Sequence, residues 1–453
     1  MYLPDFIDRP ALVRRRSTLA QALEGPALLA AGGLVARNYP ANPHPYRASS
    51  HFLYFVGAGI PGAWLLVDGA ATLYLPDPQP DDDLWHGPTP GFAQVAELLG
   101  LAVKPLSALK ADLGGRVPAT ITALDAATRA AQGERARAPA ADEALAEAII
   151  RQRLVHDAAA IAELRRAAEA TVAAHRVGMG CTRPGLHEWV VKAEMEAELA
   201  RRGMGTAYRS IVSVHGEVLH NEHHHHPLAA GDLLLVDVGA ETRGGFAGDV
   251  TRTWPVSGQF SPTQRDLYDV VLAAQQAAIT CARPGVRYRD VHLAAARQLT
   301  VGLVDLGILR GDVDGLVEDD VHALFFPHGI GHLLGLDVHD MEDLGDRAGY
   351  APGRTRSARF GLGYLRLDRD LEPGMAVTIE PGFYQVPALL QDPRRLVSVG
   401  DRLDREVLAR FADVRGIRIE DDILITADGN EVLTGALARS APEVEAEVGR
   451  CRG

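Results

Sequence analysis

The stretch GDLLLVDVG, residues 231–239, passes through four apolar side chains and then reaches an acid, Asp237. Short apolar runs that are bounded by glycine are typical of buried strands. Two later stretches have the same form: GMAVTIEPG (374–382), which reaches Glu380, and GIRIEDDILIT (416–426), which reaches Glu420. A single acid at a strand end is explained by a solvated loop. Several carboxylates that point inward from a sheet are costly unless they are paired or bind a cation.

A fourth acid, Asp249, lies in GGFAGDVTRTW, twelve residues after Asp237. That separation is about the reach of a hairpin, so we expect the two aspartates to face each other across adjacent strands. In the third stretch, strand alternation places Arg418, Glu420 and Asp422 on one face and isoleucines on the other. The sequence therefore predicts a sheet region where acids from separate strands converge.

Three histidines, His328, His332 and His339, lie in FFPHGIGHLLGLDVHDMED, residues 325–343. Glycines at 329, 331 and 335 argue against a regular helix, so we predict a loop that brings imidazoles together. Carboxylates and imidazoles without a thiolate form a hard ligand set, which favours Mn²⁺, Co²⁺ or Mg²⁺ and also accepts Zn²⁺. Bridging carboxylates suit two ions about 3.5–4 Å apart, and such centres catalyse hydrolysis.

The composition fits a two-domain protein of the cytoplasm. The chain has 453 residues and a net charge of −13, which argues against nucleic acid or an anionic membrane as a partner. Its three cysteines are scattered, and the first residues show no secretory signal. No apolar stretch is long enough to predict a membrane span. We expect the RRR cluster at 14–16 to lie on a solvated helix face.

The two halves of the chain differ in pattern, and we place the boundary between residues 155 and 156. For the first domain (1–155) the pattern predicts helices at 9–23 and 91–100, strands at 27–31 and 51–57, and a hairpin at 63–76 that turns at Asp68-Gly69. For the second (156–453) it predicts helices at 157–180 and 261–285 besides the three strands, the latter helix with a capping box at Ser261 and Gln264. Helices and strands without regular alternation indicate an α+β fold.

The ordered motifs LLLVDVG, FAGDVTRTWPV, PHGIGHLLGLDVHD, TIEPGFY and GIRIEDDILIT resemble those of the pita-bread metallopeptidases, in the aminopeptidase P and prolidase branch. NPHPYRASSHFLYFVG and DLWHG resemble the amino-terminal domain of aminopeptidase P. The resemblance covers nearly the whole chain. It implies a pita-bread catalytic domain preceded by a smaller α/β domain, and an exopeptidase with two divalent ions, most simply Mn²⁺, that hydrolyses Xaa-Pro bonds.

The resemblance also implies roles for individual residues. The metal ligands would be Asp237, Asp249, His332, Glu380 and Glu420, with Asp249 and Glu420 bridging and Glu380 also acting as general base. Residues around the scissile bond would be His220, His328 and His339, with Arg418 and Tyr384 steadying the carboxylates. Trp85 resembles a tryptophan that in some relatives reaches a neighbouring subunit, so a homo-oligomer is expected.

One spacing departs from the family pattern. The first two aspartates are usually eleven residues apart, whereas Asp237 and Asp249 are twelve apart. We expect the turn ETRGG (241–245) to absorb the extra residue, because a slip of one would point Asp249 away from the site. The neighbouring histidines 223–226 are expected to form a polar rim outside the metal site.

The preferred substrate is the remaining question. Aminopeptidase P removes the first residue from longer Xaa-Pro peptides, and the N-terminal motifs favour that activity. Prolidase cleaves only Xaa-Pro dipeptides, and two features favour it: the 340–363 segment and Arg366, which could hold a free carboxylate by two parallel hydrogen bonds. Creatinase-like and non-catalytic pita-bread proteins lack several of the acids.

Overall fold

The computed structural model describes residues 8–79, 82–133 and 138–450. The chain forms two compact units that divide between Ala159 and Ala160, and each is described by itself. Of the helices in these ranges, none combines the length and the apolar character needed to cross a bilayer.

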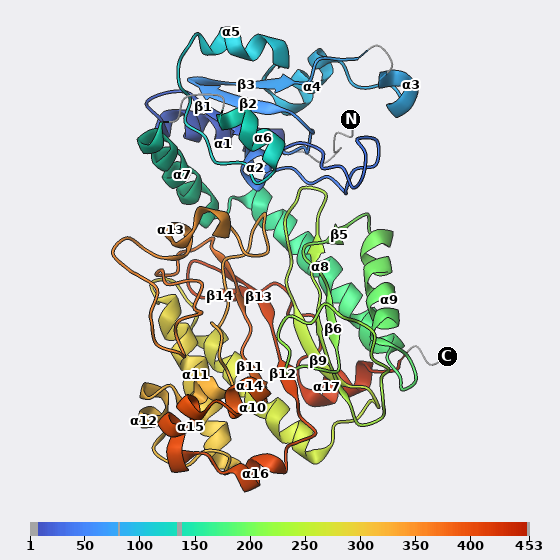
Figure 1. The fold of residues 1–453 in the computed structure, drawn as a ribbon, viewed down its shortest axis with the longest axis vertical. Helices are drawn as coiled ribbons and strands as arrows, with labels where there is room; N and C mark the ends of the chain where they lie inside the picture. The colour runs from blue at the N-terminus through green and yellow to red at the C-terminus, as the bar shows by residue number, and fades with distance from the viewer. Residues whose placement is uncertain (1–7, 80–81, 134–137, 451–453) are drawn as a thin grey trace. The chain divides into compact units, whose positions relative to one another are not determined.

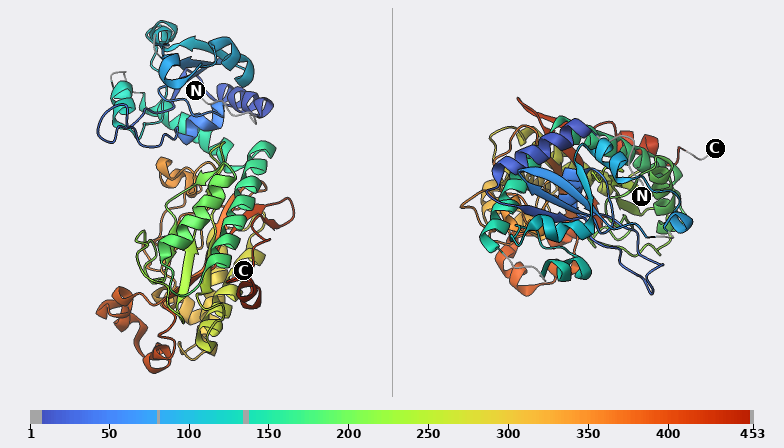
Figure 2. Two further views of the ribbon diagram at one scale, coloured as in Figure 1. Left: turned by 90° about the vertical axis from the view of Figure 1, so that its right-hand side faces the viewer. Right: turned by 90° about the horizontal axis from the view of Figure 1, so that it is seen from above.

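The N-terminal unit contains a four-stranded sheet in the order β1-β2-β3-β4 (Figure 1). Its strands are β1 (Ala27–Ala30), β2 (Trp64–Asp68), β3 (Ala70–Leu75) and β4 (Ala102–Pro105), and only the β3–β4 pair is parallel. Its helices are α1 (Arg9–Ala22), α2 (Ser50–Val56), α3 (Asp82–His86), α4 (Phe92–Leu99), α5 (Leu109–Leu113), α6 (Ala126–Gly133) and α7 (Pro139–Leu154). The β2–β3 hairpin turns at Gly69 with φ +68°, which confirms the predicted turn. The sheet lies between α1 and the helices α5 and α6 (Figure 2).

Two predictions for this unit were wrong, and the two segments concerned contact each other. Residues 51–56 of the predicted strand lie in helix α2 (Ser50–Val56). All seven residues of this helix are buried, so apolar alternation could not distinguish helix from strand. In the cluster at 14–16 only Arg14 is exposed as predicted, because Arg15 and Arg16 are only 7% and 4% exposed. Both guanidinium groups donate to carbonyl groups at the end of α2, Tyr54 O at 3.1 Å and Phe55 O at 2.8 Å. These buried arginines satisfy carbonyls that a helix end leaves without partners.

The C-terminal unit packs long helices against short curved sheets. The helices are α8 (Ala158–Cys181), α9 (Glu188–Arg201), α10 (Pro262–Cys281), α11 (Tyr288–Asp305), α12 (Val313–Glu318), α13 (Asp346–Gly349), α14 (Pro387–Leu390), α15 (Pro393–Val399), α16 (Arg405–Ala409) and α17 (Ala441–Glu447). The predicted helices at 157–180 and 261–285 are confirmed, and the Ser261–Gln264 capping box is present. Helix α9 packs on β6 and α10 packs on β10, β11 and β12, so the strands lie inside the unit (Figure 1).

The sheets of this unit pair strands that are distant in sequence. They have the orders β6-β7-β9, β10-β13-β14, β11-β12 and β5-β8. The strands are β5 (Gly205–Thr206), β6 (Ile211–Ser213), β7 (Leu233–Asp237), β8 (Ala240–Glu241), β9 (Thr251–Pro255), β10 (Ala376–Ile379), β11 (Gly382–Tyr384), β12 (Gly416–Arg418), β13 (Asp421–Ile425) and β14 (Asn430–Val432). The strands predicted around 231–239 and 374–382 are confirmed as β7 and β10.

The stretch 416–426 is not one strand, as predicted, but two strands in different sheets. Strand β12 pairs with β11, and β13 pairs with β10. Between them the backbone of Glu420 leaves the ladder: its N–H donates to Thr251 O at 3.0 Å, and Arg252 Nη1 donates to its carbonyl at 2.6 Å. Glu420 therefore lies at a joint between two sheets, held by the start of β9.

Candidate metal centre and active site

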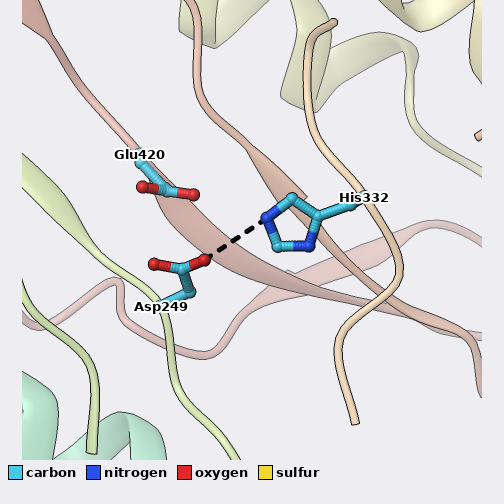
Figure 3. Close-up of side chains that lie close together, drawn as sticks. All are labelled: Asp249, His332 and Glu420. Carbon is cyan, nitrogen blue, oxygen red and sulfur yellow. Dashed lines mark ion pairs between the residues drawn. The ribbon is translucent and has the colours of Figure 1, made fainter. Parts of the chain in front are cut away.

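Three residues from separate parts of the C-terminal unit converge on one point (Figure 3). Asp249 lies just before β9, His332 in the 325–343 loop, and Glu420 between β12 and β13. One oxygen or nitrogen from each lies within 4.8 Å of the others, and all three residues are buried. Asp249 Oδ2 is 3.3 Å from His332 Nε2. Oxygen and imidazole donors this close together fit a divalent cation.

Asp237 joins this group through a tyrosine. It ends β7 directly opposite Thr251 of β9, which brings it beside Asp249. The Tyr208 hydroxyl lies 2.5 Å from Oδ1 of each aspartate. The twelve-residue spacing thus leaves Asp249 facing the site, as expected. The turn between the two aspartates closes with Gly245, at φ +88°, donating its N–H to Thr242 O at 2.8 Å.

Glu380 is the fourth carboxylate, directly after β10. Its Oε1 is 3.6 Å from His332 Nε2 and its Oε2 is 3.9 Å from His328 Nδ1. Burial raises the pKa of Glu380 to about 7. Burial, followed by the neighbouring Asp237, raises the pKa of Asp249 to about 8, and the pKa of Glu420 is also raised by burial. Buried acids with raised pKa values are carboxylates whose negative charges the protein alone does not balance, and a bound cation would balance them.

Arg418 holds the opposite side of the cluster. Its Nη2 donates to Asp237 Oδ2 at 2.6 Å, and its Nη1 to the Tyr384 hydroxyl at 3.1 Å. Its Nε donates to Thr251 Oγ1, 2.9 Å away, and the Thr251 hydroxyl donates to Glu420 Oε2 at 2.6 Å. One guanidinium thus connects a tyrosine and two carboxylates in fixed geometry. Such outer contacts orient metal ligands.

His328 is held as a neutral imidazole. Its Nε2 lies 2.9 Å from the Tyr384 hydroxyl and its Nδ1 lies 2.8 Å from Gly329 O. Burial and then Arg418 lower the pKa of His328 to about 3. His339 packs edge-on against His332, with ring centres 4.3 Å apart.

A cavity of about 370 Å³ opens onto these groups. Ten predicted site residues line it: His220, Asp237, Asp249, His328, His332, His339, Arg366, Glu380, Arg418 and Glu420. Tyr384 lies behind the lining and contacts it through His328 and Arg418. Trp85 belongs to α3 of the N-terminal unit and is 75% exposed. Histidines 223–226 are not among the lining residues; His226 instead pairs with Glu188 at 3.0 Å, and His224 bonds Ser210 O at 2.8 Å.

Sequence reasoning missed several residues of this site. Tyr208 had no recognisable motif, and Arg356 and Tyr364, which also line the cavity, lie in or beside the 340–363 segment. Thr251 could have been found, because it occupies the position across the ladder from Asp237. Asp422, predicted on the face of Glu420, instead accepts the backbone N–H of Asp249 at 3.2 Å from behind.

Comparisons with known proteins agree with this site. Metallopeptidase family M24 matches residues 162–427, and the aminopeptidase P N-terminal domain matches residues 12–120. Xaa-Pro aminopeptidase of Escherichia coli K12 is 33% identical over 97% of this chain and 98% of its own length. Xaa-Pro dipeptidase of Homo sapiens is 37% identical over 61% of this chain and 56% of its own. The solved structure of Pseudomonas aeruginosa aminopeptidase PepP matches with a TM-score of 0.83 at 30% identity, covering 98% of this chain and 99% of that one.

These matches confirm the expected α+β architecture of an aminopeptidase P N-terminal domain followed by a pita-bread domain. They run through both units, and the metallopeptidase match contains every residue of the buried acid cluster. The chain therefore belongs to metallopeptidase family M24 and is a hydrolase that binds divalent metal.

Proposed function

We propose that this chain is a dinuclear Xaa-Pro aminopeptidase, which removes the first residue from peptides that carry proline second. The observation that carries the proposal is the convergence of four carboxylates and His332 in the lining of one cavity, where Asp249, His332 and Glu420 are buried. The full-length match to an Xaa-Pro aminopeptidase, N-terminal domain included, supports peptides longer than two residues.

The ligand set supports two ions. Asp249, His332 and Glu420 form one compact donor group, Asp237 stands beside Asp249, and Glu380 beside His332. Oxygen donors and one imidazole favour Mn²⁺, with Co²⁺ or Zn²⁺ as the alternatives. When bound, the ions supply Lewis acidity to the peptide carbonyl and acidify a water molecule.

The remaining residues bind the peptide and handle protons. We assign Glu380 as the general base, because it faces the donor group and its pKa lies near neutrality. We assign two roles to His220, His328 and His339, which line the cavity: they bind the substrate, and they stabilise the negative charge that develops on its carbonyl oxygen. Arg418 and Tyr384 position these groups through the hydrogen bonds described above.

A second candidate activity is cleavage of Xaa-Pro dipeptides. Arg366 lines the cavity and could bind the free carboxylate of a dipeptide. The match to the human Xaa-Pro dipeptidase supports this activity.

We also infer a cytoplasmic homo-oligomer. The three cysteines are scattered along the sequence and suit a reducing compartment, and the exposed Trp85 suits a contact with a neighbouring subunit.

The test compares an Xaa-Pro-Yaa tripeptide with the corresponding dipeptide, before and after chelation. We expect the Mn²⁺-loaded protein to cleave the tripeptide, and activity to disappear with chelator and return with metal. Cleavage of the dipeptide alone would refute the aminopeptidase assignment. A protein that holds no stoichiometric divalent metal after loading would refute the metal mechanism.

A further inference from the structure

The active-site cavity and a smaller one share three lining residues, His332 and two arginines. A side cavity of about 110 Å³ adjoins the active-site cavity, and Arg356 and Arg366 line both. The carboxylates of the metal centre line only the larger cavity, whereas Glu342 and Asp346 line only the smaller one. Each arginine pairs with one of these two acids. The two arginines that line the active-site cavity are thus each paired with a carboxylate, Asp346 or Glu342, that lines only the smaller cavity.

The two arginines differ in how many of their guanidinium nitrogens already donate hydrogen bonds within the protein. Arg356 uses all its nitrogens: Nη2 donates to Asp346 at 2.6 Å, Nε to the same carboxylate, and Nη1 to Leu365 O at 2.8 Å. Arg366 uses Nη1 alone, which donates to both oxygens of Glu342 at 2.8 and 2.7 Å. Within the described ranges, its Nε and Nη2 make no hydrogen bond. The Nε–Nη2 edge of a guanidinium is one that can bind a carboxylate through two parallel hydrogen bonds.

Glu342 also contacts the catalytic side of the cavity. Its Oε2 lies 3.4 Å from His339 Nδ1, and His339 packs against His332. Burial acts to raise the pKa of Glu342, but His339 and Arg366 outweigh it and lower that pKa to about 2. The Glu342 carboxylate is therefore negatively charged at any pH near neutrality. It connects Arg366, which lines the active-site cavity, with the imidazole of His339, which packs against His332.

We propose that Glu342 is a positioning residue that anchors Arg366 through Nη1 and so presents its Nε–Nη2 edge to the terminal carboxylate of an Xaa-Pro dipeptide. An unanchored arginine this exposed would occupy many rotamers and would lose their entropy on binding. This inference rests on the proposed function and deepens it, since it makes acceptance of dipeptides depend on a residue outside the active-site cavity.

The test uses two substrates that differ only in the group to be recognised, Ala-Pro and its C-terminal amide. Because charged hydrogen bonds are the strong ones, the wild type should favour the acid by about 10- to 100-fold in kcat/KM. Arg366→Ala should reduce this ratio to about 1. Glu342→Ala should raise KM for the acid by about tenfold and change KM for the amide by less than about threefold. Any disturbance of His339 lowers kcat for both substrates and cancels in the ratio.

Three comparisons guard the interpretation. The variant that combines Glu342→Ala with Arg366→Ala should have the same acid-to-amide ratio of kcat/KM as Arg366→Ala alone, because both changes act on one contact. Glu342→Gln keeps the shape of the side chain and one acceptor oxygen, so its KM for the acid should lie between those of the wild type and Glu342→Ala. This variant also provides a test if Glu342→Ala folds poorly. Glu431→Gln removes a carboxylate that pairs with Arg165 on another face of the same unit and should change neither KM.

Full discrimination in both Glu342 variants would overturn the positioning role. A wild type that does not distinguish acid from amide while cleaving tripeptides would overturn this inference and leave the aminopeptidase assignment intact. Failure to cleave any of these peptides would overturn both.

Discussion

Replacing Tyr208 with phenylalanine removes one hydroxyl and tests how the two aspartates are held. That hydroxyl lies 2.5 Å from Oδ1 of both Asp237 and Asp249. The other oxygens of these carboxylates face Arg418, at 2.6 Å, and His332, at 3.3 Å. Burial, followed by Asp237, raises the pKa of Tyr208 well above its ordinary value, so the hydroxyl keeps its proton and can donate it. Because the hydroxyl has one proton, it donates to one aspartate at a time and bridges the two carboxylates, whose other oxygens contact Arg418 and His332.

The size of the effect follows from these contacts. A hydrogen bond to a charged group is worth about 1.5–3 kcal/mol, and 1.4 kcal/mol is about tenfold in an equilibrium constant. The hydroxyl orients the carboxylates of Asp237 and Asp249 for the metal. Tyr208→Phe should therefore weaken the affinity for Mn²⁺ by about 10- to 100-fold. Loss of an outer partner of a metal ligand has the same general magnitude. Activity should recover as Mn²⁺ is raised, because no ligand atom is removed.

The measurement is a Mn²⁺ titration of metal-free protein, by calorimetry or by competition with a chelator. The matched control is Tyr268→Phe, at a buried tyrosine whose hydroxyl donates to Arg439 O at 2.7 Å and does not contact the site. The control should lose about 1 kcal/mol of stability and keep its metal affinity. A Kd for Tyr208→Phe within about twofold of wild type would show that the hydroxyl does not orient the carboxylates.

Three further perturbations test the site and the surrounding fold. Because the pKa values of Asp249 and Glu380 are raised to about 8 and 7, their contribution to folding is complete below about pH 4 and is lost as the pH rises through 7 and 8. The thermal midpoint of metal-free protein should therefore fall between pH 6 and 8.5 (roughly that window), and divalent metal should reverse the fall; calorimetry showing a flat or rising midpoint would contradict this. Gly416→Ala would place a carbon 2.3 Å from the backbone of the facing loop and should cost about 1–3 kcal/mol, whereas Gly205→Ala, with open space, should cost far less by the same thermal measurement. Arg252→Leu breaks a fully buried ion pair and should cost about 3–5 kcal/mol; a loss below about 1 kcal/mol in a denaturant titration would refute the importance of the pair.

Local patterns predicted the elements whose determinants are local. The Ser261 capping box and the Asp68-Gly69 turn are each set by a few neighbouring residues, and both are confirmed. Residues 51–57 were misread because a segment buried on every side has no alternation to detect. The buried Arg15 and Arg16 were missed because their partners lie 39 to 142 residues away along the chain.

The site shows the same division. Acids at strand ends and the histidine loop were visible as motifs, and the ten candidates that line the cavity had all been named from the sequence. Tyr208 acts on aspartates 29 and 41 residues away, and its flanking residues carry no pattern that predicts this. Glu342 was read only as part of an insertion, because its contact partner Arg366 lies 24 residues further along the chain and the contact depends on how the residues between them fold.

The break between β12 and β13 connects the fold to the site. In one continuous strand, Glu420 would have its backbone paired in a ladder and its side chain aligned with those of Arg418 and Asp422. Instead its backbone bonds to Thr251 and Arg252 at the start of β9, the same segment that Asp249 precedes. The break thus places Glu420, between β12 and β13, close to Asp249, just before β9. The Thr251 hydroxyl fixes the Glu420 carboxylate by donating a hydrogen bond to it. An irregularity in strand pairing is what allows carboxylates from distant strands to share one cation site.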